Sequence, residues 1–116
     1  MARELHLEDE KIDGILIINV GGRIDGLNAQ DFHNSLDQST RDFDGSVVLD
    51  FDKLTYISSA GLRSILLIAN SFKEKKKNFM LCSLPESALQ VIRISGFDKV
   101  VAIHESRVVA IAAAME

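Results

Sequence analysis

Two adjacent serines, Ser58 and Ser59, occupy the position in this sequence that is best suited to chemistry. Before them, a short apolar run at residues 47–49 predicts a buried strand, and the polar residues that follow it predict a tight turn. After them, apolar residues recur at three- and four-residue spacing and predict one face of a helix: Leu62, Ile65, Leu66, Ala69 and Phe72. The two serines are therefore expected where the chain enters an amphipathic helix.

A hydroxyl at this point can serve as a helix cap and as an acceptor of phosphate. As the N-cap, Ser58 or Ser59 would accept a hydrogen bond from an amide of the first helical turn. The positive end of the helix dipole tolerates added negative charge, and a phosphate would add roughly −1.5 to −2 charges at neutral pH. The pattern therefore indicates a position that would accommodate added negative charge.

Patterns for catalysis or metal binding do not accompany the serines. No histidine stands at a recognisable spacing to act as their base, and Ser64 lacks the flanking glycines of a nucleophile elbow. The histidines at 6, 33 and 104 are far apart in sequence and predict no metal site. Cys82, the single cysteine, is expected in the core. We therefore expect no enzymatic activity, no metal and no cofactor.

Length, charge and composition limit the class of protein to which the chain can belong. A chain of 116 residues is long enough for one domain, expected to span residues 1–116. The net charge is −4, and no basic stretch has interleaved aromatic residues, so nucleic acid is not an expected partner. The first residues lack an apolar signal core, and no apolar run approaches the ~20 residues needed to cross a bilayer. These features predict a cytoplasmic protein that is not inserted in a membrane.

The rest of the pattern predicts an α/β fold. An alternating segment, the Asp13-Gly14 turn and a second apolar segment predict an opening hairpin, which Gly21 and Gly22 are expected to end. Helical and strand patterns then alternate, which requires parallel neighbours and right-handed crossovers in a mixed five-stranded sheet with about four helices. The expected strands are residues 5–7, 15–20, 47–49, 79–82 and 100–103, and the expected helices are residues 28–39, 58–72, 85–95 and 105–115.

The string ISSAGLRSILL at residues 57–67 resembles the signature of the STAS domain, as found in bacterial anti-sigma factor antagonists. In that family Asp-Ser-Ser/Thr-Gly-Leu opens a helix, and a partner kinase phosphorylates the first serine. Aligned in order, the five family positions fall on Ser58, Ser59, Ala60, Gly61 and Leu62. The resemblance thus implies phosphorylation at Ser59. Because a serine replaces the family aspartate, Ser58 is a rival acceptor.

A second string, GGRIDGLNAQDF at residues 21–32, resembles the family segment that leads into its first helix. The family aspartate there lies near the phosphoserine loop and contributes to partner or nucleotide contacts, and its position falls on Asp25. The residues alone equally allow a turn aspartate that binds local amides. The ending, VIRISGFDKVVAIHES at residues 91–106, also looks like the family's third helix and last strand, so the resemblance covers residues 5–115.

The resemblance implies a single-domain STAS-like protein that regulates transcription by partner switching. It would bind an anti-sigma factor that is also a serine kinase, leave it on phosphorylation at Ser59, and be restored by a serine phosphatase. On the outer side of the helix, Leu67 and Arg63 are candidate contacts, because they lie opposite the apolar stripe. The expected partner-binding residues are Asp25, Ser58, Ala60, Gly61, Leu62, Arg63 and Leu67, in a monomer or weak dimer.

Two alternatives remain open at this point. A STAS module can instead be a subunit of a lipid-transport complex or a scaffold in a sensory assembly. Asp50, expected at a strand end, also resembles the phospho-acceptor of a receiver domain. The receiver alternative is disfavoured because the required acidic pair is missing after the first strand and Lys99 precedes the fifth strand.

Overall fold

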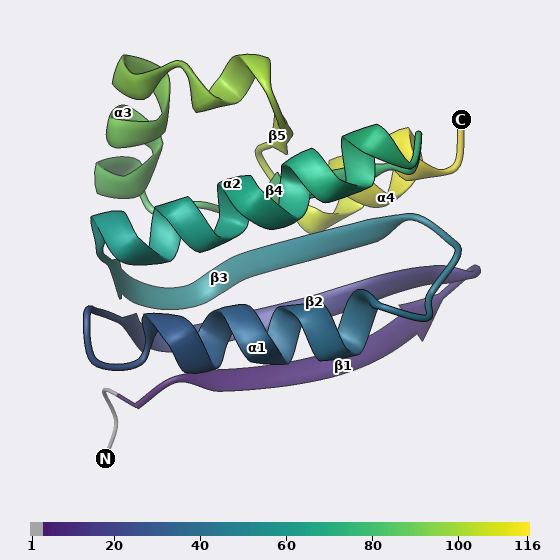
Figure 1. Cartoon of the computed structure of the whole chain (residues 1–116). Helices are drawn as coiled ribbons and strands as arrows, with labels where there is room; N and C mark the ends of the chain where they lie inside the picture. Colours follow the sequence, from purple (N-terminus) through teal and green to yellow (C-terminus); the bar gives the residue numbers. More distant parts are fainter. Residues whose placement is uncertain (1–3) are drawn as a thin grey trace.

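The chain folds around a mixed five-stranded sheet, and the computed structural model describes residues 4–116. β1 is antiparallel to β2, whereas β2, β3, β4 and β5 follow as parallel neighbours (Figure 1). The strands are β1 (His6–Ile12), β2 (Ile15–Ile24), β3 (Val47–Ile57), β4 (Phe79–Cys82) and β5 (Ala102–His104). The helices are α1 (Ala29–Thr40), α2 (Ser59–Glu74), α3 (Glu86–Ser95) and α4 (Arg107–Ala114), with a short 3₁₀ turn η1 (Phe97–Lys99). The expected fold class is confirmed.

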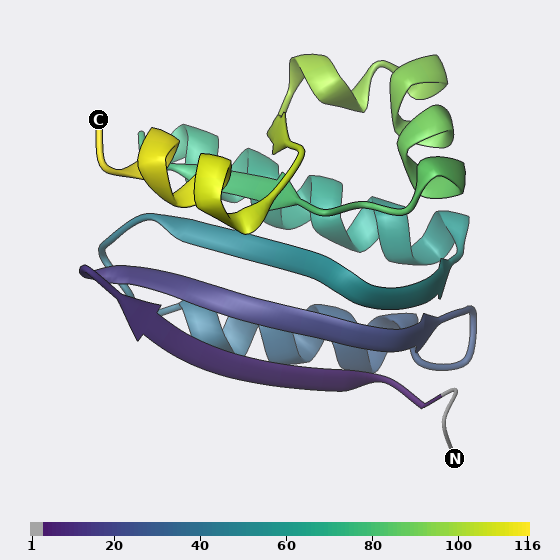
Figure 2. The same cartoon turned by 180° about the vertical axis from the view of Figure 1, so that it is seen from behind.

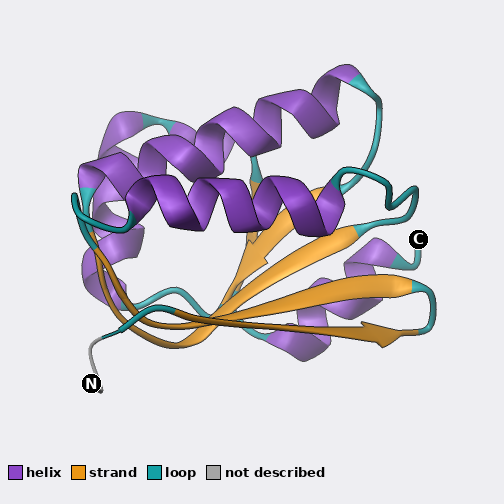
Figure 3. Ribbon diagram, turned by 60° about the horizontal axis from the view of Figure 1, so that its bottom comes forward, coloured by secondary structure: helices purple, strands orange, loops and turns teal. Residues whose placement is uncertain are grey.

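The main core lies between the sheet and the pair α1 and α2, which run side by side over one face (Figures 1 and 3). Phe32 and Leu36 of α1 and Ile65 of α2 are almost completely buried there. They pack with inward residues of the central strands, such as Phe51 and Leu49. Apolar spacing of three and four residues on each helix therefore found the correct buried faces.

The opposite face of the sheet is divided into an apolar half and a polar half. α4 covers the apolar half, where Ala110 and Ala114 pack on Ile17 and Val48 (Figure 2). Side chains alternate along a strand, so Asn19 follows Ile17 on this face, as Asp50 follows Val48. A single short helix of small residues is enough to cover only the apolar part.

β2 and β3 are longer than the sequence predicted. The tight turn expected after residue 49 is wrong, because β3 continues to Ile57, and the glycine pair does not end β2, which continues to Ile24. Parallel pairing of the two strands satisfies their backbone groups along this extension. The polar residues of β3 therefore stay in an extended strand with exposed side chains, such as Asp52 and Lys53.

Two register shifts bend β3 against β2. Asn19 pairs with Asp50, but Gly21 pairs with Lys53, and a second shift follows between Gly22 and Arg23. Each shift inserts an extra residue into β3, as in a β-bulge, and bulges bend a strand and increase its twist. The curvature of β3 in Figure 1 carries its last residues to the start of α2.

Several boundaries also differ from the predictions. β1 extends to Ile12 rather than ending at residue 7, while β5 and α4 begin two residues later than expected. Pro85 is the N-cap of α3 rather than a member of its first turn, and Gly96 takes the expected left-handed cap conformation with φ 83°. Asn28 precedes α1 as expected but makes no capping hydrogen bond with its side chain.

Replacement of Gly22 by alanine should destabilise the folded protein. Its φ is +85°, and a Cβ placed on it would lie 1.8 Å from the carbonyl oxygen of Glu4. We expect Gly22→Ala to lower the free energy of unfolding by about 2–4 kcal/mol, through a disfavoured backbone conformation and overpacking. Urea unfolding measures the change. Gly26→Ala is the matched control, because a Cβ there meets nothing within 4 Å; equal stability losses in the two variants would contradict this account.

Candidate functional site

Ser58 is the N-cap of α2, and hydrogen bonds of its side chain and its backbone hold it in place. Its Oγ accepts a hydrogen bond from the Gly61 amide at 3.2 Å, and its own amide donates to the Ile24 carbonyl at 2.8 Å. The side chain is half-buried. The predicted cap is thus confirmed, and it ties the start of α2 to the end of β2.

Ser59 differs from Ser58 in its exposure to solvent and in its hydrogen bonding. It is the first residue of α2, and it is exposed. Its hydroxyl makes no hydrogen bond within residues 4–116. Its backbone is held in the first helical turn while its side chain is free, so a modifying protein can reach the oxygen without unfolding the helix.

Gly61 and Leu62 position the serine turn by packing it against the sheet and the main core. A Cβ on Gly61 would lie 2.6 Å from Ile24 Cγ2 and 2.8 Å from Ile57 Cγ1, so only glycine lets the helix approach the ends of β2 and β3 this closely. Leu62 is buried in the main core. Both residues were predicted at the partner surface, and the structure places their side-chain positions beneath it.

Asp25 organises the loop between β2 and α1. Its Oδ1 accepts hydrogen bonds from the amides of Leu27 at 2.9 Å and Asn28 at 3.3 Å, and Arg23 Nε donates to its Oδ2 at 3.3 Å. The Leu27 amide, with the other two donors, lowers the pKa of the Asp25 carboxyl. This is the turn aspartate that the residues alone allowed. It directly follows Ile24, which pairs with the serine turn.

Exposed residues at this edge form what we call the serine surface. On α2, Ser59, Arg63 and Leu67 recur every four residues and therefore share one face, with Leu67 51% exposed as predicted. Ala60 is also exposed. The β2–α1 loop lies at the same edge of the molecule (Figures 1 and 2). The exposed side chains of the serine surface are those of Leu27, Ser59, Ala60, Arg63 and Leu67, together with that of Tyr56 at the end of β3. Tyr56 precedes the inward-facing Ile57, so its side chain lies on the face of the sheet opposite α2.

Two features of the serine surface favour protein contact. Leu27 is 95% exposed and Tyr56 is 43% exposed, which is a large apolar area for a loop and a strand end. The guanidinium of Arg23 stacks on the Tyr56 ring at 4.3 Å from its centroid. Stacked arginine and aromatic side chains are frequent anchors of protein interfaces.

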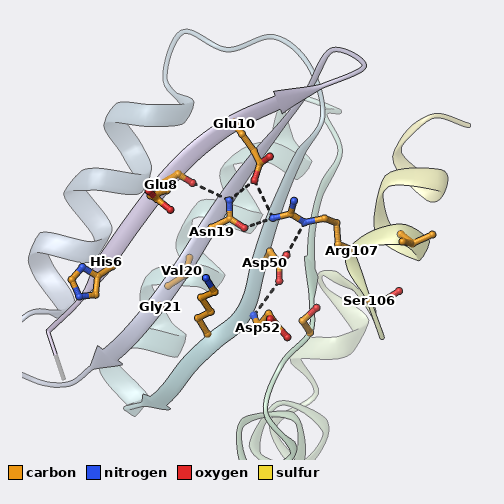
Figure 4. Close-up of a pocket in the computed structure, with 13 residues that line it drawn as sticks. His6, Glu8, Glu10, Asn19, Val20, Gly21, Asp50, Asp52, Ser106 and Arg107 are labelled. Carbon is orange, nitrogen blue, oxygen red and sulfur yellow. Dashed lines mark hydrogen bonds and ion pairs between the residues drawn. The ribbon is translucent and has the colours of Figure 1, made fainter. Parts of the chain in front are cut away.

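A second polar site, which the sequence analysis missed, centres on Arg107 at the start of α4 (Figure 4). Arg107 Nε donates to Asp50 Oδ2 at 2.9 Å, and Nη2 lies 3.1 Å from Glu10 Oε2 and also donates to Asn19 Oδ1. Asn19 Nδ2 donates to Glu10 Oε2 at 2.7 Å, which lowers the pKa of Glu10, with a further contribution from the charge of Arg107. These residues border a pocket of about 540 Å³.

The Arg107 cluster anchors α4, and it corrects the expectation that Asp50 stands at a strand end. Asp50 lies inside β3, paired with Asn19 and with Cys82, and is only 6% exposed. Its carboxylate also accepts a hydrogen bond from the Asp52 amide at 3.0 Å. A buried, ion-paired aspartate in mid-strand is not a receiver acceptor. The signal in the sequence was one polar residue within each of two otherwise apolar strand segments, Asn19 in β2 and Asp50 in β3.

Other groups offer little chemistry. Cys82 is buried, and burial raises the pKa of its thiol to about 11. Among residues 4–116, no group of three or more histidine, cysteine or acidic side chains could hold a metal ion. In the same range, every helix is too short or too polar to cross a membrane. The free hydroxyl of Ser59 is therefore the group at the serine surface with the clearest chemical use.

A mixed sheet in this order, with a strand that passes through a serine cap into the second helix, defines the STAS class of domain. The model of the STAS domain family matches residues 6–110. The chain belongs to this family, as the signature at residues 57–67 predicted.

Known relatives support the assignment in sequence and in structure. BtrV of Bordetella bronchiseptica, classed as an anti-sigma factor antagonist, is 37% identical over 109 residues, covering 94% of each chain. The crystal structure of an anti-sigma factor antagonist from Mycobacterium paratuberculosis has a TM-score of 0.87 at 19% identity, covering 100% of this chain and 98% of that one. The Bacillus cell fate determinant SpoIIAA in its phosphorylated form has a TM-score of 0.70 at 14% identity, covering 95% and 98%. The last two similarities concern the fold.

Removing Arg107 should leave a buried charge without its partner. We expect Arg107→Gln to lower the free energy of unfolding by about 2–3 kcal/mol, less than for a fully buried pair because Arg107 is partly exposed. The double variant Asp50→Asn/Arg107→Gln should be less destabilised than the sum of the single variants, since no unpaired charge remains. Urea unfolding of all four proteins measures the coupling, and strict additivity would show that the two side chains act independently.

Proposed function

We propose that the protein is an anti-sigma factor antagonist controlled by phosphorylation of Ser59. In this proposal it binds an anti-sigma factor that is also a serine kinase while Ser59 is unmodified, and it is released once Ser59 carries phosphate. The hydroxyl of Ser59 at the start of α2, which is exposed and makes no hydrogen bond to the described residues 4–116, carries the proposal. The relationship to BtrV supports the role, and the proposed action on a sigma factor pathway would take place in the bacterial cytoplasm.

The chemistry requires nothing from this chain except an accessible oxygen. A base of the kinase takes the proton of Ser59 Oγ, the oxygen attacks the γ-phosphorus of ATP, and the bond from that phosphorus to ADP breaks. A serine phosphatase reverses the modification by hydrolysis, which returns the hydroxyl and releases inorganic phosphate. Ser58 is the poorer acceptor, because it is half-buried and its Oγ is engaged with the Gly61 amide.

The modification acts at the surface. A phosphate adds roughly −1.5 to −2 charges, and the positive end of α2 accommodates them. A partner whose patch is apolar or acidic must then desolvate or repel the phosphate. A cost of only ~3 kcal/mol weakens binding by more than a hundredfold.

The rest of the serine surface supplies the proposed contacts. Leu27, Tyr56 and Leu67 provide apolar area, and Arg63 provides a positive charge that fits an acidic patch on the kinase. Asp25 contributes by shaping the loop that presents Leu27, because it accepts the hydrogen bond from the Leu27 amide.

Ser59→Ala should abolish phosphorylation, whereas Ser58→Ala should retain it. Each protein is incubated with ATP and with candidate serine kinases of the same cell, and phosphate is located by mass spectrometry. In the unmodified protein we expect phosphate on Ser59 and loss of the kinase complex with it. Phosphate on Ser58 alone would overturn the choice of acceptor, and a stable complex with transporter or sensory subunits would instead favour those roles of the domain.

Leu67→Asp should weaken kinase binding without affecting the fold. The side chain is half exposed, so a carboxylate there costs the folded protein little. In the complex it would be desolvated against the partner, and we expect at least a tenfold loss of affinity by calorimetry. Val108→Asp is the matched control, since Val108 is exposed on α4, at the other face of the sheet. Unchanged affinity in Leu67→Asp would remove this residue from the interface.

A further inference from the structure

We propose that Arg63 binds the phosphate on Ser59, so that the modified protein holds its phosphate in an intramolecular ion pair. The inference rests on the proposed modification of Ser59 and adds a second consequence to it. Phosphorylation would then place a negative charge on the serine surface and also withdraw the arginine that the partner meets in the unmodified protein.

The register of α2 places the two side chains together. Ser59 is the first residue of the helix and Arg63 follows four residues later, both exposed. Four residues correspond to a rotation of about 40° and a rise of about 6 Å, so the two residues are neighbours on one face. An acidic group on the N-terminal side of a basic one is the favourable orientation for such a pair.

Arg63 is available for this contact, whereas the other arginine near the serine turn is occupied. Within residues 4–116, Arg63 makes no hydrogen bond or ion pair. Arg23 donates to Asp25 and stacks on Tyr56. A phosphate on Ser59 would therefore recruit Arg63 without breaking an existing interaction, and a guanidinium can bind two phosphate oxygens at once.

The same register distinguishes Ser59 from Ser58, the alternative phosphate acceptor. Ser58 precedes Arg63 by five residues, which turns the two side chains roughly 140° apart around the helix. The Oγ of Ser58 also faces the Gly61 amide rather than the outer row of α2. Arg63 would thus stabilise phosphate on Ser59 and leave phosphate on Ser58 unpaired.

The test places the phosphate without a kinase. Phosphoserine is incorporated during translation at position 59 of the full chain, and the second pKa of the phosphate is measured by ³¹P NMR titration. The same titration is made with Arg63→Gln, Arg63→Lys and Arg23→Gln. Lys73→Gln is the matched control, because it removes a positive charge from α2 at about 21 Å along the axis from Ser59. Phosphoserine at position 58, with and without Arg63→Gln, tests the register.

If Arg63 binds the phosphate, Arg63→Gln should raise the second pKa of phosphoserine 59 by about half a unit or more, towards the ordinary value near 6. Arg63→Lys should raise it less, and Lys73→Gln should leave it unchanged. The phosphate at position 58 should not respond to Arg63→Gln. An unchanged pKa in Arg63→Gln, or a shift that follows Arg23→Gln instead, would overturn the inference.

These outcomes are independent of the proposed function, because no kinase takes part. A protein that shows the shift but is modified by none of the cell's kinases would refute the proposed function and leave the ion pair standing. A protein that is phosphorylated on Ser59 by its kinase but shows no shift would refute the ion pair alone.

Discussion

The close approach of α2 to the paired ends of β2 and β3 is the constraint on which the rest of this structure depends. One hydrogen bond, from the Ser58 amide to the Ile24 carbonyl, continues the strand pairing into the first residue before the helix. The absent side chain of Gly61 lets the helix rest on Ile24 and Ile57. Because the backbone on both sides is fixed, Ser59 is exposed in a defined orientation and the Asp25 loop is held beside it.

The bulges of β3 serve the same arrangement. Without the two register shifts, the strand would end at a different height and angle relative to β2. The bend also divides β3 into a part that anchors α4 and a part that leads into the serine turn. Its first half carries Asp50, which anchors α4 through Arg107, and its last residues carry Tyr56 and the serine turn. One strand thus links the anchoring of the C-terminal helix with the surface that we propose for signalling.

Local patterns predicted the order of the elements, the buried faces of α1 and α2 and a serine cap at residue 58 or 59, because each depends on residues close in sequence. The ends of β2 and β3 were missed for a physical reason. Their extensions are stabilised by pairing between strands about thirty residues apart, and Gly21, Gly22 and Asp52 signal a turn when read locally. The Arg107 site was missed for the same reason, since Asp50 and Arg107 are 57 residues apart and obey no spacing rule. Ser59, in contrast, was predicted as the modified residue from its motif together with a helix start that the residues themselves predict.

The departure from the family motif at Ser58 has an electrostatic consequence for the proposed switch. With serine instead of aspartate at the cap, residues 58–62 contain no acidic side chain, so the positive end of the α2 dipole lacks a negative neighbour on its own helix. A phosphate on Ser59 would be the first negative charge in this turn, with Arg63 the basic group one turn further along. The helix start would then favour the modified state rather than merely tolerate it. A switch built in this way would need no change in the packed core, because Gly61 and Leu62 already hold the turn against the ends of β2 and β3. The effect of the modification would then fall on the surface that a partner meets.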